Sequence, residues 1–299
     1  MMISSISKLQ IPMTNNQVNI KIQNPKQLLK NLGIKPSKKL GQNFLIDNLV
    51  LKKIIEAAEL NSNDIVLEIG PGLGILTLEL AKRVKKVIAI EKDKTLCQVL
   101  QNLLTVRRVN NVKIINKDVL QISNFKFLIS NRIPNPNYKI IANLPFYITS
   151  PLIRKFLEIK NPPQLMVLMV QKEVAQRICA EPPQMNLLAV AVQFYAQPKI
   201  ITHVSKNSFY PQPKVDSAII KIIPKPIPKI DTEKFFKIIK GGFSSKRKVL
   251  INNLSRELKI ENYKLKIVFD QIGLGQKLRA ENLSINDWLN LYEIIKSHF

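Results

Sequence analysis

The sequence predicts an α/β chain in which a mostly parallel sheet is followed by a small all-α domain. Between residues 65 and 223, short apolar segments typical of buried strands alternate with stretches of helical spacing. Strands that are separated by helices imply βαβ units and therefore a parallel sheet. Segment 224–228 has proline at every second position, which suits an extended linker. Beyond residue 230 the apolar spacing is helical, which predicts the all-α domain.

The expected elements follow in order along the chain. Residues 1–26 are polar, rich in Asn and Gln and without apolar periodicity, so we expect a flexible N-terminal tail. Residues 27–224 form the α/β domain, with a helix over 75–84 and strands at 65–69, 87–90, 112–115, 139–142, 165–170 and 218–223. Residues 225–299 form the helical domain, with helical spacing in 235–239, 249–258 and 288–292.

The composition excludes several classes of protein. A chain of 299 residues that is 45% apolar and 22% charged can bury a core, so global disorder and collagen-like repeats are excluded. No apolar run approaches the roughly 18 residues that span a bilayer. The two cysteines, Cys97 and Cys179, have no C-x-x-C spacing, so we expect neither a disulfide framework nor a metal site. A reducing, cytoplasmic location is favoured, and an acid-free tail leaves an organellar targeting peptide as the alternative.

The net charge of +25 indicates a polyanionic partner. Lys and Arg that neutralise phosphates release counterions, which is the main source of sequence-independent affinity for nucleic acids. Most of the basic residues are Lys, in a chain also rich in Asn and Ile, so an A+T-rich genome is an alternative cause. Residues 1–46 hold seven Lys and no acidic residue, and the helical domain is also strongly basic. The charge is therefore concentrated towards the two ends of the chain.

A glycine loop at 70–74 follows the first strand of the α/β pattern and precedes a helix. Glycines at such a place allow a sharp turn and a close approach of the backbone to a ligand. The dinucleotide fingerprint needs a third glycine at position 75, where this chain has Ile75, so a nicotinamide or flavin site is disfavoured. A tight G-x-G-x-G loop with an acid just before it suits S-adenosylmethionine instead.

Two acids at the ends of the next strands complete the predicted cofactor site. Glu91 ends the second strand, where a carboxylate can accept hydrogen bonds from both ribose hydroxyls. Asp118 follows the third strand, where it can accept from the exocyclic amine of the cofactor's adenine. Either acid alone would more often be a solvated strand end or a helix cap. Their order after the glycine loop favours the cofactor interpretation.

The turn of Asn143, Leu144, Pro145 and Phe146 follows the fourth expected strand and is the predicted reaction site. It brings an amide oxygen, a backbone carbonyl and an aromatic ring to the sheet edge where α/β proteins bind ligands. An adenine N6 is a poor nucleophile because its lone pair is delocalised into the ring. Hydrogen bonds from its N–H groups to Asn143 Oδ1 and a loop carbonyl would localise that lone pair towards a methyl donor. Phe146 would stack on the target base.

Seven ordered motifs resemble the small-subunit ribosomal RNA adenine dimethyltransferases, the KsgA type. They are LGQNFL at 40–45, the glycine loop, NLPF at 143–146, QKEV at 171–174, SFYPQPKVDS at 208–217, FSSKRK at 243–248 and RAENL at 279–283. The resemblance implies a Rossmann-like class I methyltransferase fold. It also implies S-adenosylmethionine-dependent dimethylation at N6 of two adjacent adenosines in a hairpin loop near the 3′ end of small-subunit rRNA, linked to ribosome maturation.

The resemblance also carries roles to individual residues. Asn43 and Leu45 fall where the family covers the methionine moiety of the cofactor, and Gly70 falls on the glycine-loop contact. Asn143 is shared by the cofactor pocket and the target amine, and Phe209 falls on a second aromatic residue against the target base.

The chain departs from the family pattern at two places. Phe146 stands where Tyr is usual, so a hydroxyl contact is lost while stacking is kept. Met185 and Asn186 replace a common Tyr-Gly pair, which puts the local loop geometry in doubt.

Two basic clusters are candidate RNA contacts. Lys38 and Lys39 precede the LGQNFL motif and are expected near the cofactor site, where they could hold the target strand. Lys246, Arg247 and Lys248 are expected within a helix of the C-terminal domain, which the resemblance assigns to rRNA docking, whereas a solvated charged face is the plain alternative. We expect a monomer that acts on the small ribosomal subunit or its precursor.

Two other functions remain open from the sequence. One is the related large-subunit rRNA adenine methylation that confers macrolide resistance. The other is a nucleic-acid-binding protein on the same fold that has lost catalysis. The 208–217 motif favours the small-subunit family, and the intact set of Asn143, Pro145, Phe146, Glu91 and Asp118 favours an enzyme.

Overall fold

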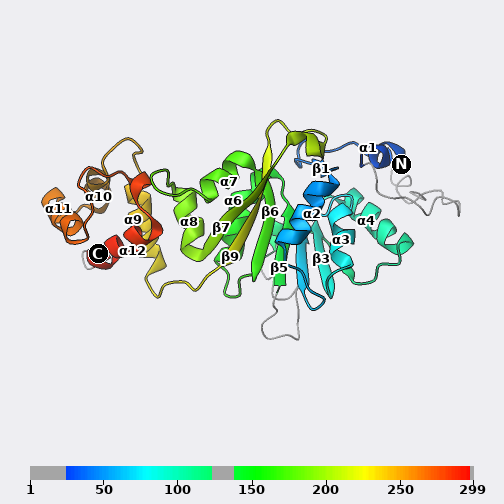
Figure 1. Cartoon of the computed structure of the whole chain (residues 1–299), viewed down its shortest axis with the longest axis horizontal. Helices are drawn as coiled ribbons and strands as arrows, with labels where there is room; N and C mark the ends of the chain where they lie inside the picture. Colours follow the sequence, from blue (N-terminus) through cyan, green and yellow to red (C-terminus); the bar gives the residue numbers. More distant parts are fainter. Residues whose placement is uncertain (1–24, 123–137, 297–299) are drawn as a thin grey trace, which may run out of the picture.

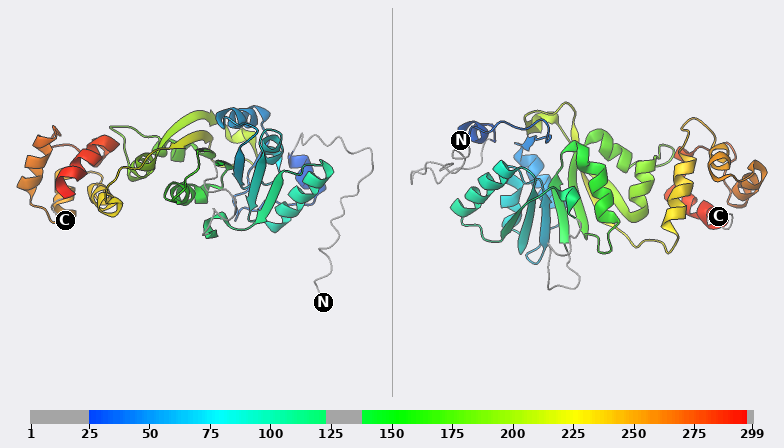
Figure 2. Two further views of the ribbon diagram at one scale, coloured as in Figure 1. Left: turned by 90° about the horizontal axis from the view of Figure 1, so that it is seen from below. Right: turned by 180° about the vertical axis from the view of Figure 1, so that it is seen from behind.

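A computed structural model of the chain describes residues 25–122 and 138–296. For Phe146, within the second range, it describes the backbone but not the side chain. The molecule is elongated, with the α/β sheet at one end and the C-terminal helices at the other (Figures 1 and 2). Residues 1–24 of the predicted tail lie outside the described residues. Helix α1 (Pro25–Asn31) begins within the last two residues of the segment predicted as tail.

The centre of the molecule is a seven-stranded sheet with the order β4-β3-β2-β5-β6-β9-β7. Its first five strands are parallel, whereas β9 runs antiparallel to both β6 and β7. The strands are β2 (Ile65–Ile69), β3 (Lys86–Glu91), β4 (Val112–Asn116), β5 (Tyr138–Asn143), β6 (Leu165–Gln171), β7 (Ala196–Val204) and β9 (Ser217–Pro224). All six strands expected from the sequence are present, and the α/β class is confirmed.

Helices cover both faces of the sheet (Figure 1). Odd-numbered positions of β2, such as Leu67, pack with α6 (Thr149–Leu157), α7 (Lys172–Ile178) and α8 (Leu187–Tyr195). Even-numbered positions, such as Val66, pack with α2 (Asn48–Ala57) and α3 (Ile75–Ala81), while α4 (Lys94–Val106) lies on Ala89 of β3. Because parallel strands are apolar on both faces, they need a helical layer on each side.

Three strands were not predicted from the sequence. Strand β7 lies at the edge of the sheet and contains Pro198, which breaks the apolar pattern of a central strand but is tolerated at an edge. The other two, β1 (Phe44–Leu45) and β8 (Phe209–Tyr210), form a separate antiparallel pair of two residues each. A strand of two residues carries no periodicity, so spacing cannot predict it.

The C-terminal part is helical, as predicted. It contains α9 (Thr232–Gly242), α10 (Leu250–Leu258), α11 (Asn262–Gln271) and α12 (Ile285–Ile295), with a 3₁₀ turn at Ala280–Asn282. Its core is continuous with one face of the sheet: Phe194 of α8 stacks on Phe235 of α9, with ring centroids 4.8 Å apart. The division into domains at residues 224 and 225 stays a prediction.

The predicted helix over Lys246, Arg247 and Lys248 is wrong. These residues lie in the loop between α9 and α10, and all three are exposed. The Asn253 amide Nδ2 donates to the carbonyls of Gly242 and Ser245, at 2.8 and 2.9 Å, and so holds the loop in a non-helical path. The basic residues therefore project from a turn rather than from one face of a helix.

A buried ion pair joins the amino ends of the central strands. Lys139 at the start of β5 lies 2.9 Å from Asp64, which immediately precedes β2, and both side chains are less than a tenth exposed. Asp64 also accepts from the backbone N–H and the side-chain amide of Asn61. Removing one partner of such a pair leaves the other charge buried without compensation.

We therefore expect Lys139→Ala to lower the free energy of unfolding by about 3–5 kcal/mol. Lys113→Ala on the edge strand β4 is the matched control, because Lys113 is exposed and its loss should change stability by less than about 0.5 kcal/mol. Urea unfolding followed by circular dichroism measures both values. Equal, small losses in the two variants would contradict a structural role for the pair.

Candidate active site

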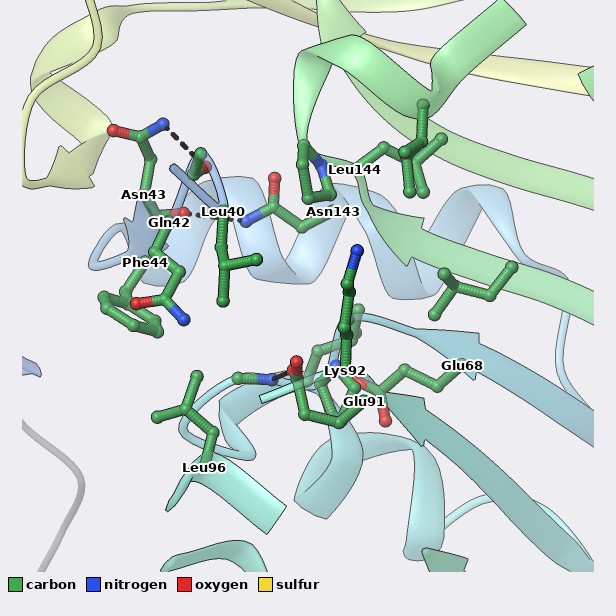
Figure 3. Close-up of a pocket in the computed structure, with 18 of the residues that line it drawn as sticks. Leu40, Gln42, Asn43, Phe44, Glu68, Glu91, Lys92, Leu96, Asn143 and Leu144 are labelled. Carbon is green, nitrogen blue, oxygen red and sulfur yellow. Dashed lines mark hydrogen bonds between the residues drawn. The ribbon is translucent and has the colours of Figure 1, made fainter. Parts of the chain in front are cut away.

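One cavity opens at the carboxyl ends of β2, β3 and β5, and it gathers the residues predicted from the sequence. All six predicted cofactor residues line it: Asn43, Leu45, Gly70, Glu91, Asp118 and Asn143. Of the predicted reaction-site residues, Leu144, Pro145 and Phe209 line it as well. Figure 3 shows Asn143 above the acids Glu68 and Glu91, with Leu40 and Asn43 beside it on the left. The structure therefore brings motifs from four separate parts of the chain to one site.

The glycine loop forms the floor of the cavity. Gly70, Gly72 and Gly74 have φ angles of +70°, +57° and +82°, a left-handed conformation that disfavours residues with a Cβ. A Cβ on Gly74 would also lie 2.5 Å from Leu100 Cδ1 of α4. The Gly70 N–H donates to the Ile90 carbonyl at 3.0 Å, which ties the loop to β3. The loop thus remains narrow enough for a ligand to lie against its backbone.

Glu91 is held in position by the backbone around it. Its Oε2 accepts from the Gly72 N–H at 3.2 Å and its Oε1 accepts from the Asp93 N–H at 2.8 Å. Burial raises the pKa of the carboxyl, and these hydrogen bonds oppose the rise because they stabilise the charged form. Glu91 is therefore oriented at the end of β3 before any ligand binds, as its predicted ribose role requires.

Asp118 forms an ion pair with Lys92 at the side of the cavity. Lys92 Nζ lies 2.9 Å from Asp118 Oδ2, and Oδ1 accepts from the Leu120 N–H at the start of a 3₁₀ turn (Val119–Gln121). The hydrogen bond from Lys92 keeps the pKa of Asp118 below its usual value. Asp118 is thus a charged acceptor, as its predicted contact with an exocyclic amine requires.

The LGQNFL motif forms the cavity's outer wall. Gln42 donates to Asp93 Oδ2 at 2.8 Å, which attaches the wall to the first turn of α4. Phe44 pairs with Tyr210, and Leu45 pairs with Phe209, in the short β1–β8 ladder. Ser208 Oγ also donates to Asp47 Oδ2 at 2.9 Å. Two motifs far apart in the sequence therefore stabilise each other within one wall of the cavity.

The Asn143 amide bridges the wall and the sheet. Its Nδ2 donates to the Asn43 carbonyl at 3.1 Å, so its Oδ1 remains as an acceptor (Figure 3). Leu144 donates its N–H to the Met169 carbonyl at 3.1 Å, which holds the turn against β6. The predicted stacking of Phe146 concerns a side chain outside the described part of the structure, although its backbone begins a 3₁₀ turn (Phe146–Ile148).

Glu68 is the acid just before the glycine loop, and the sequence assigned it no individual role in the site. It lies in β2, is 1% exposed and lines the cavity, and neither of its carboxylate oxygens has a hydrogen-bond partner among the described residues. Burial raises its pKa to about 8, the Thr77 hydroxyl beside it opposes the rise, and the nearby Glu91 charge adds to it. An unpartnered carboxyl beside a glycine loop fits a ligand that carries an ammonium group, as S-adenosylmethionine does.

Tyr147 is a second residue that the sequence did not reveal. It lines the same cavity, yet 56% of it is exposed, and its ring lies against the Gly41 backbone. In a strand such as β2 a burial pattern can be predicted from spacing, but the outward projection of one aromatic ring from a 3₁₀ turn cannot. An exposed aromatic face at a cavity mouth is a surface on which a base can stack.

The predicted RNA contacts divide into two places. Lys38 and Lys39 are exposed and immediately precede Leu40, the first residue of the chain that lines the cavity. The exposed loop of Lys246, Arg247 and Lys248 lies in the helical part, at the far end of the molecule (Figure 1). The structure does not bring these two basic clusters together.

Residues 25–122 and 138–296 contain no group of three or more His, Cys, Asp or Glu side chains placed to hold a metal ion. In the same residues, no helix has the length and apolar character needed to cross a membrane.

Comparisons with known proteins show the family of the chain. A family profile described as ribosomal RNA adenine dimethylase matches residues 33–297. Ribosomal RNA small subunit methyltransferase A of Alkaliphilus oremlandii is 40% identical over 269 residues, which cover 88% of this chain and 93% of that protein. The protein of the same name from Clostridium botulinum is 42% identical over 277 residues, which cover 91% of this chain and 98% of that protein.

Two crystal structures share the fold. A dimethyladenosine transferase from Plasmodium falciparum has a TM-score of 0.74 and 28% identity, and the match covers 85% of this chain and 98% of that one. The 23S rRNA methyltransferase ErmE has a TM-score of 0.70 and 26% identity, covering 85% and 100%. The class I methyltransferase sheet with C-terminal helices is thus confirmed. The chain belongs to the ribosomal RNA adenine dimethylase family, whose methyl donor is S-adenosylmethionine.

Proposed function

We propose that this protein dimethylates N6 of two adjacent adenosines in a hairpin loop near the 3′ end of small-subunit rRNA, during ribosome maturation. The observation that carries the proposal is the Asn143 amide. Its Nδ2 is engaged by the Asn43 carbonyl, so Oδ1 is oriented as an acceptor at the sheet edge beside the Pro145 turn. An acceptor there suits an amine that must lose its planarity to react.

The chain's own residues would activate the amine without a strong base. Asn143 Oδ1 and a carbonyl of the 144–145 turn would accept the two N6 protons and localise the nitrogen lone pair. When bound, S-adenosylmethionine supplies an electrophilic methyl group on a sulfonium. The acidic proton leaves only after the amine has become charged, so a carboxylate at the target nitrogen is unnecessary. Phe209 and Tyr147, which both line the cavity, offer aromatic surfaces for the target base.

The cofactor would be held by the acids described above. Glu91 would bind the ribose hydroxyls and Asp118 the adenine amine. Glu68 is the group that fits the ammonium of the methionine moiety, because it is buried, anionic when ionised and without a cationic partner among the described residues. The wall formed by Asn43 and Leu45 would cover that moiety and exclude water.

Two alternative functions fit the protein less well. The fold does not separate small-subunit from large-subunit activity, because ErmE resembles the chain almost as closely as the dimethyladenosine transferase does. The sequence relatives separate them: those of about 40% identity over nine-tenths of the chain are small-subunit methyltransferases. A binding protein without catalysis would not need the preorganised Glu91 carboxylate or the Asn143 bridge.

The remaining expectations complete the proposal. The enzyme would act as a monomer in the cytoplasm, with the helical part docking on rRNA through the loop of Lys246, Arg247 and Lys248. Lys38 and Lys39, beside the cavity mouth, would hold the target strand. Charge at both ends of an elongated molecule supports attachment to RNA at more than one place.

The test of the function is Asn143→Ala. We expect turnover to fall by about 10²–10³-fold, because an acceptor that stabilises the transition state is lost, while the melting temperature stays close to that of the wild type. Tritiated methyl transfer to small subunits that lack the modification measures turnover, with large subunits as the substrate control. Asn63→Ala, in an exposed loop, is the variant control. Equal turnover in both variants would refute the role of Asn143.

Glu68→Gln should change stability and cofactor binding in opposite directions. In the folded protein the pKa of the Glu68 carboxyl is raised to about 8 from an ordinary 4.5. Ionisation of Glu68 therefore increasingly destabilises the fold as pH rises between these two values. At pH 7 the free energy of unfolding of Glu68→Gln is therefore expected to be about 1–3 kcal/mol higher than that of the wild type, with no gain near pH 4. Its affinity for S-adenosylmethionine should fall at least about tenfold, equivalent to 1.4 kcal/mol.

Denaturant unfolding at several pH values and calorimetric titration with the cofactor measure the two effects of Glu68→Gln. Glu233→Gln, at an exposed glutamate of α9, is the control and should leave both quantities unchanged. A loss of stability in Glu68→Gln at pH 7, together with unaltered cofactor affinity, would show that Glu68 is an ordinary core residue.

Tyr147→Ala should raise the KM for small subunits about tenfold or more, because loss of one base–aromatic stack costs about 1–3 kcal/mol. Tyr147→Phe should retain the wild-type KM, since the ring is kept. Tyr263→Ala removes a tyrosine that is equally exposed on α11 and serves as the control. A KM that is unchanged in Tyr147→Ala would exclude the ring from substrate binding.

A further inference from the structure

A second groove lies beside the cofactor cavity, and the proposed function above does not use it. Among the residues that line it are three lysines and two glutamines: Lys172, Lys206, Lys214, Gln171 and Gln176. They come from the start of α7, the 3₁₀ turn Lys206–Ser208 and the loop before β9. We call the groove lined by these three lysines the lysine groove.

The lysine groove adjoins the reaction site. Pro213 lines the cofactor cavity and the next residue, Lys214, lines the groove, so one short loop separates the two. Asn143 of β5 is in register with Met169 of β6, and Gln171 lies two residues further along that strand. Two residues of strand span about 7 Å. The groove is therefore one strand away from the proposed target amine, at the same edge of the sheet.

The backbone of the groove is fixed by Asp216. Its carbonyl accepts from the Lys172 N–H and its Oδ1 accepts from the Lys206 N–H, each at 3.0 Å. Gln171 also pairs with Ser217 in the β6–β9 ladder. These bonds join all three segments that carry the lysines. The acid is thus engaged in holding the backbone of the groove together.

The lysine side chains themselves are exposed, and none of the three amines forms an ion pair with any residue of the described ranges. The groove contains one further acid, Glu173. Like charges that are brought together on a fixed backbone repel one another unless an anion lies between them. A concave, unpaired cationic site beside a base-binding cavity fits the phosphates of a nucleic-acid strand.

We propose that the lysine groove binds phosphates of the rRNA strand next to the target adenosine, and so holds the strand while the base occupies the cavity. The inference rests on the proposed function, since it takes the substrate to be RNA. Contacts with phosphates fix the register of a strand but do not read its sequence. The groove would thereby serve both adjacent adenosines, because shifting the strand by one nucleotide brings a chemically identical phosphate to the same lysines. Gln171 and Gln176 supply amide donors along the same track.

The test replaces all three lysines with glutamine. Binding of unmodified small subunits is measured by equilibrium filter binding at several salt concentrations, and methyl transfer is measured separately at saturating subunits. We expect the dissociation constant to rise about tenfold or more and the slope of log affinity against log salt to fall by up to about 2, since each contact with a single strand contributes about 0.7. Turnover at saturation and affinity for S-adenosylmethionine should not change.

Two matched variants keep the interpretation specific. Lys→Arg at the same three positions preserves the charge and should retain both the affinity and the salt slope. The control replaces three other exposed lysines with glutamine. Lys85 and Lys160 precede β3 and β6, on the opposite, amino-terminal side of the sheet, and Lys113 lies in strand β4. This triple replacement should have little effect. The three single Lys→Gln variants of the groove should each show part of the loss.

An unchanged salt slope in the triple variant, or a loss no larger than that of the control triple, would overturn the proposal. A lower turnover at saturation with unchanged affinity would do the same, because it would mean that the lysines act on the cavity rather than on the strand. If the wild-type protein bound small subunits with the expected slope but methylated none of them, the proposed function would fail while the groove would stand.

Discussion

The alignment of the parallel strands is the constraint on which the rest of the structure depends. In β2, β3 and β5 the residues Ile69, Ile90 and Ala142 lie side by side, so the next residue of each strand reaches the same edge of the sheet. Those next residues are Gly70, Glu91 and Asn143. A slip of one position in either ladder would turn the following side chain to the other face. The buried apolar faces of all three strands oppose such a slip, since each is covered by helices on both sides. The chemistry at the edge therefore depends on packing throughout the sheet.

At that edge, the two buried acids Glu91 and Glu68 have opposite hydrogen-bonding environments. Glu91 receives two backbone hydrogen bonds and is held ready, whereas Glu68 receives none and is destabilised in its charged form. The first arrangement reduces the reorganisation needed when a ligand binds. The second favours the protonated carboxyl until a cationic ligand stabilises its charge. Binding of a cation at Glu68 would therefore be coupled to release of a proton.

The sequence predicted the parts of the fold in which burial is repetitive. Every predicted central strand is present because apolar residues on both faces leave a clear pattern. The edge strand β7 was missed because Gln197, Pro198 and Lys199 interrupt the apolar run that marks a central strand. The helix over Lys246–Lys248 was wrong because a run of like charges has no periodicity that could mark where a helix begins. Motif order predicted residues that line one cavity, but it did not reveal the environment of Glu68 or the position of Tyr147, because burial among other groups and the outward projection of a ring depend on neighbours far along the chain.

The β1–β8 pair has a consequence for how the protein is made. Its supporting bond runs from Ser208 to Asp47, 161 residues earlier, and the wall of the cavity rests on this closure. A ribosome releases the wall segment early and its partner strand late, and chains begin to fold from the N-terminus during synthesis. Strands β2 to β4 can associate as soon as residue 116 has emerged, but β1 has no strand partner until residue 210 follows. The nascent chain thus passes most of its synthesis without the β1–β8 closure, and the wall can reach its final hydrogen bonding only once about two-thirds of the 299 residues have been released.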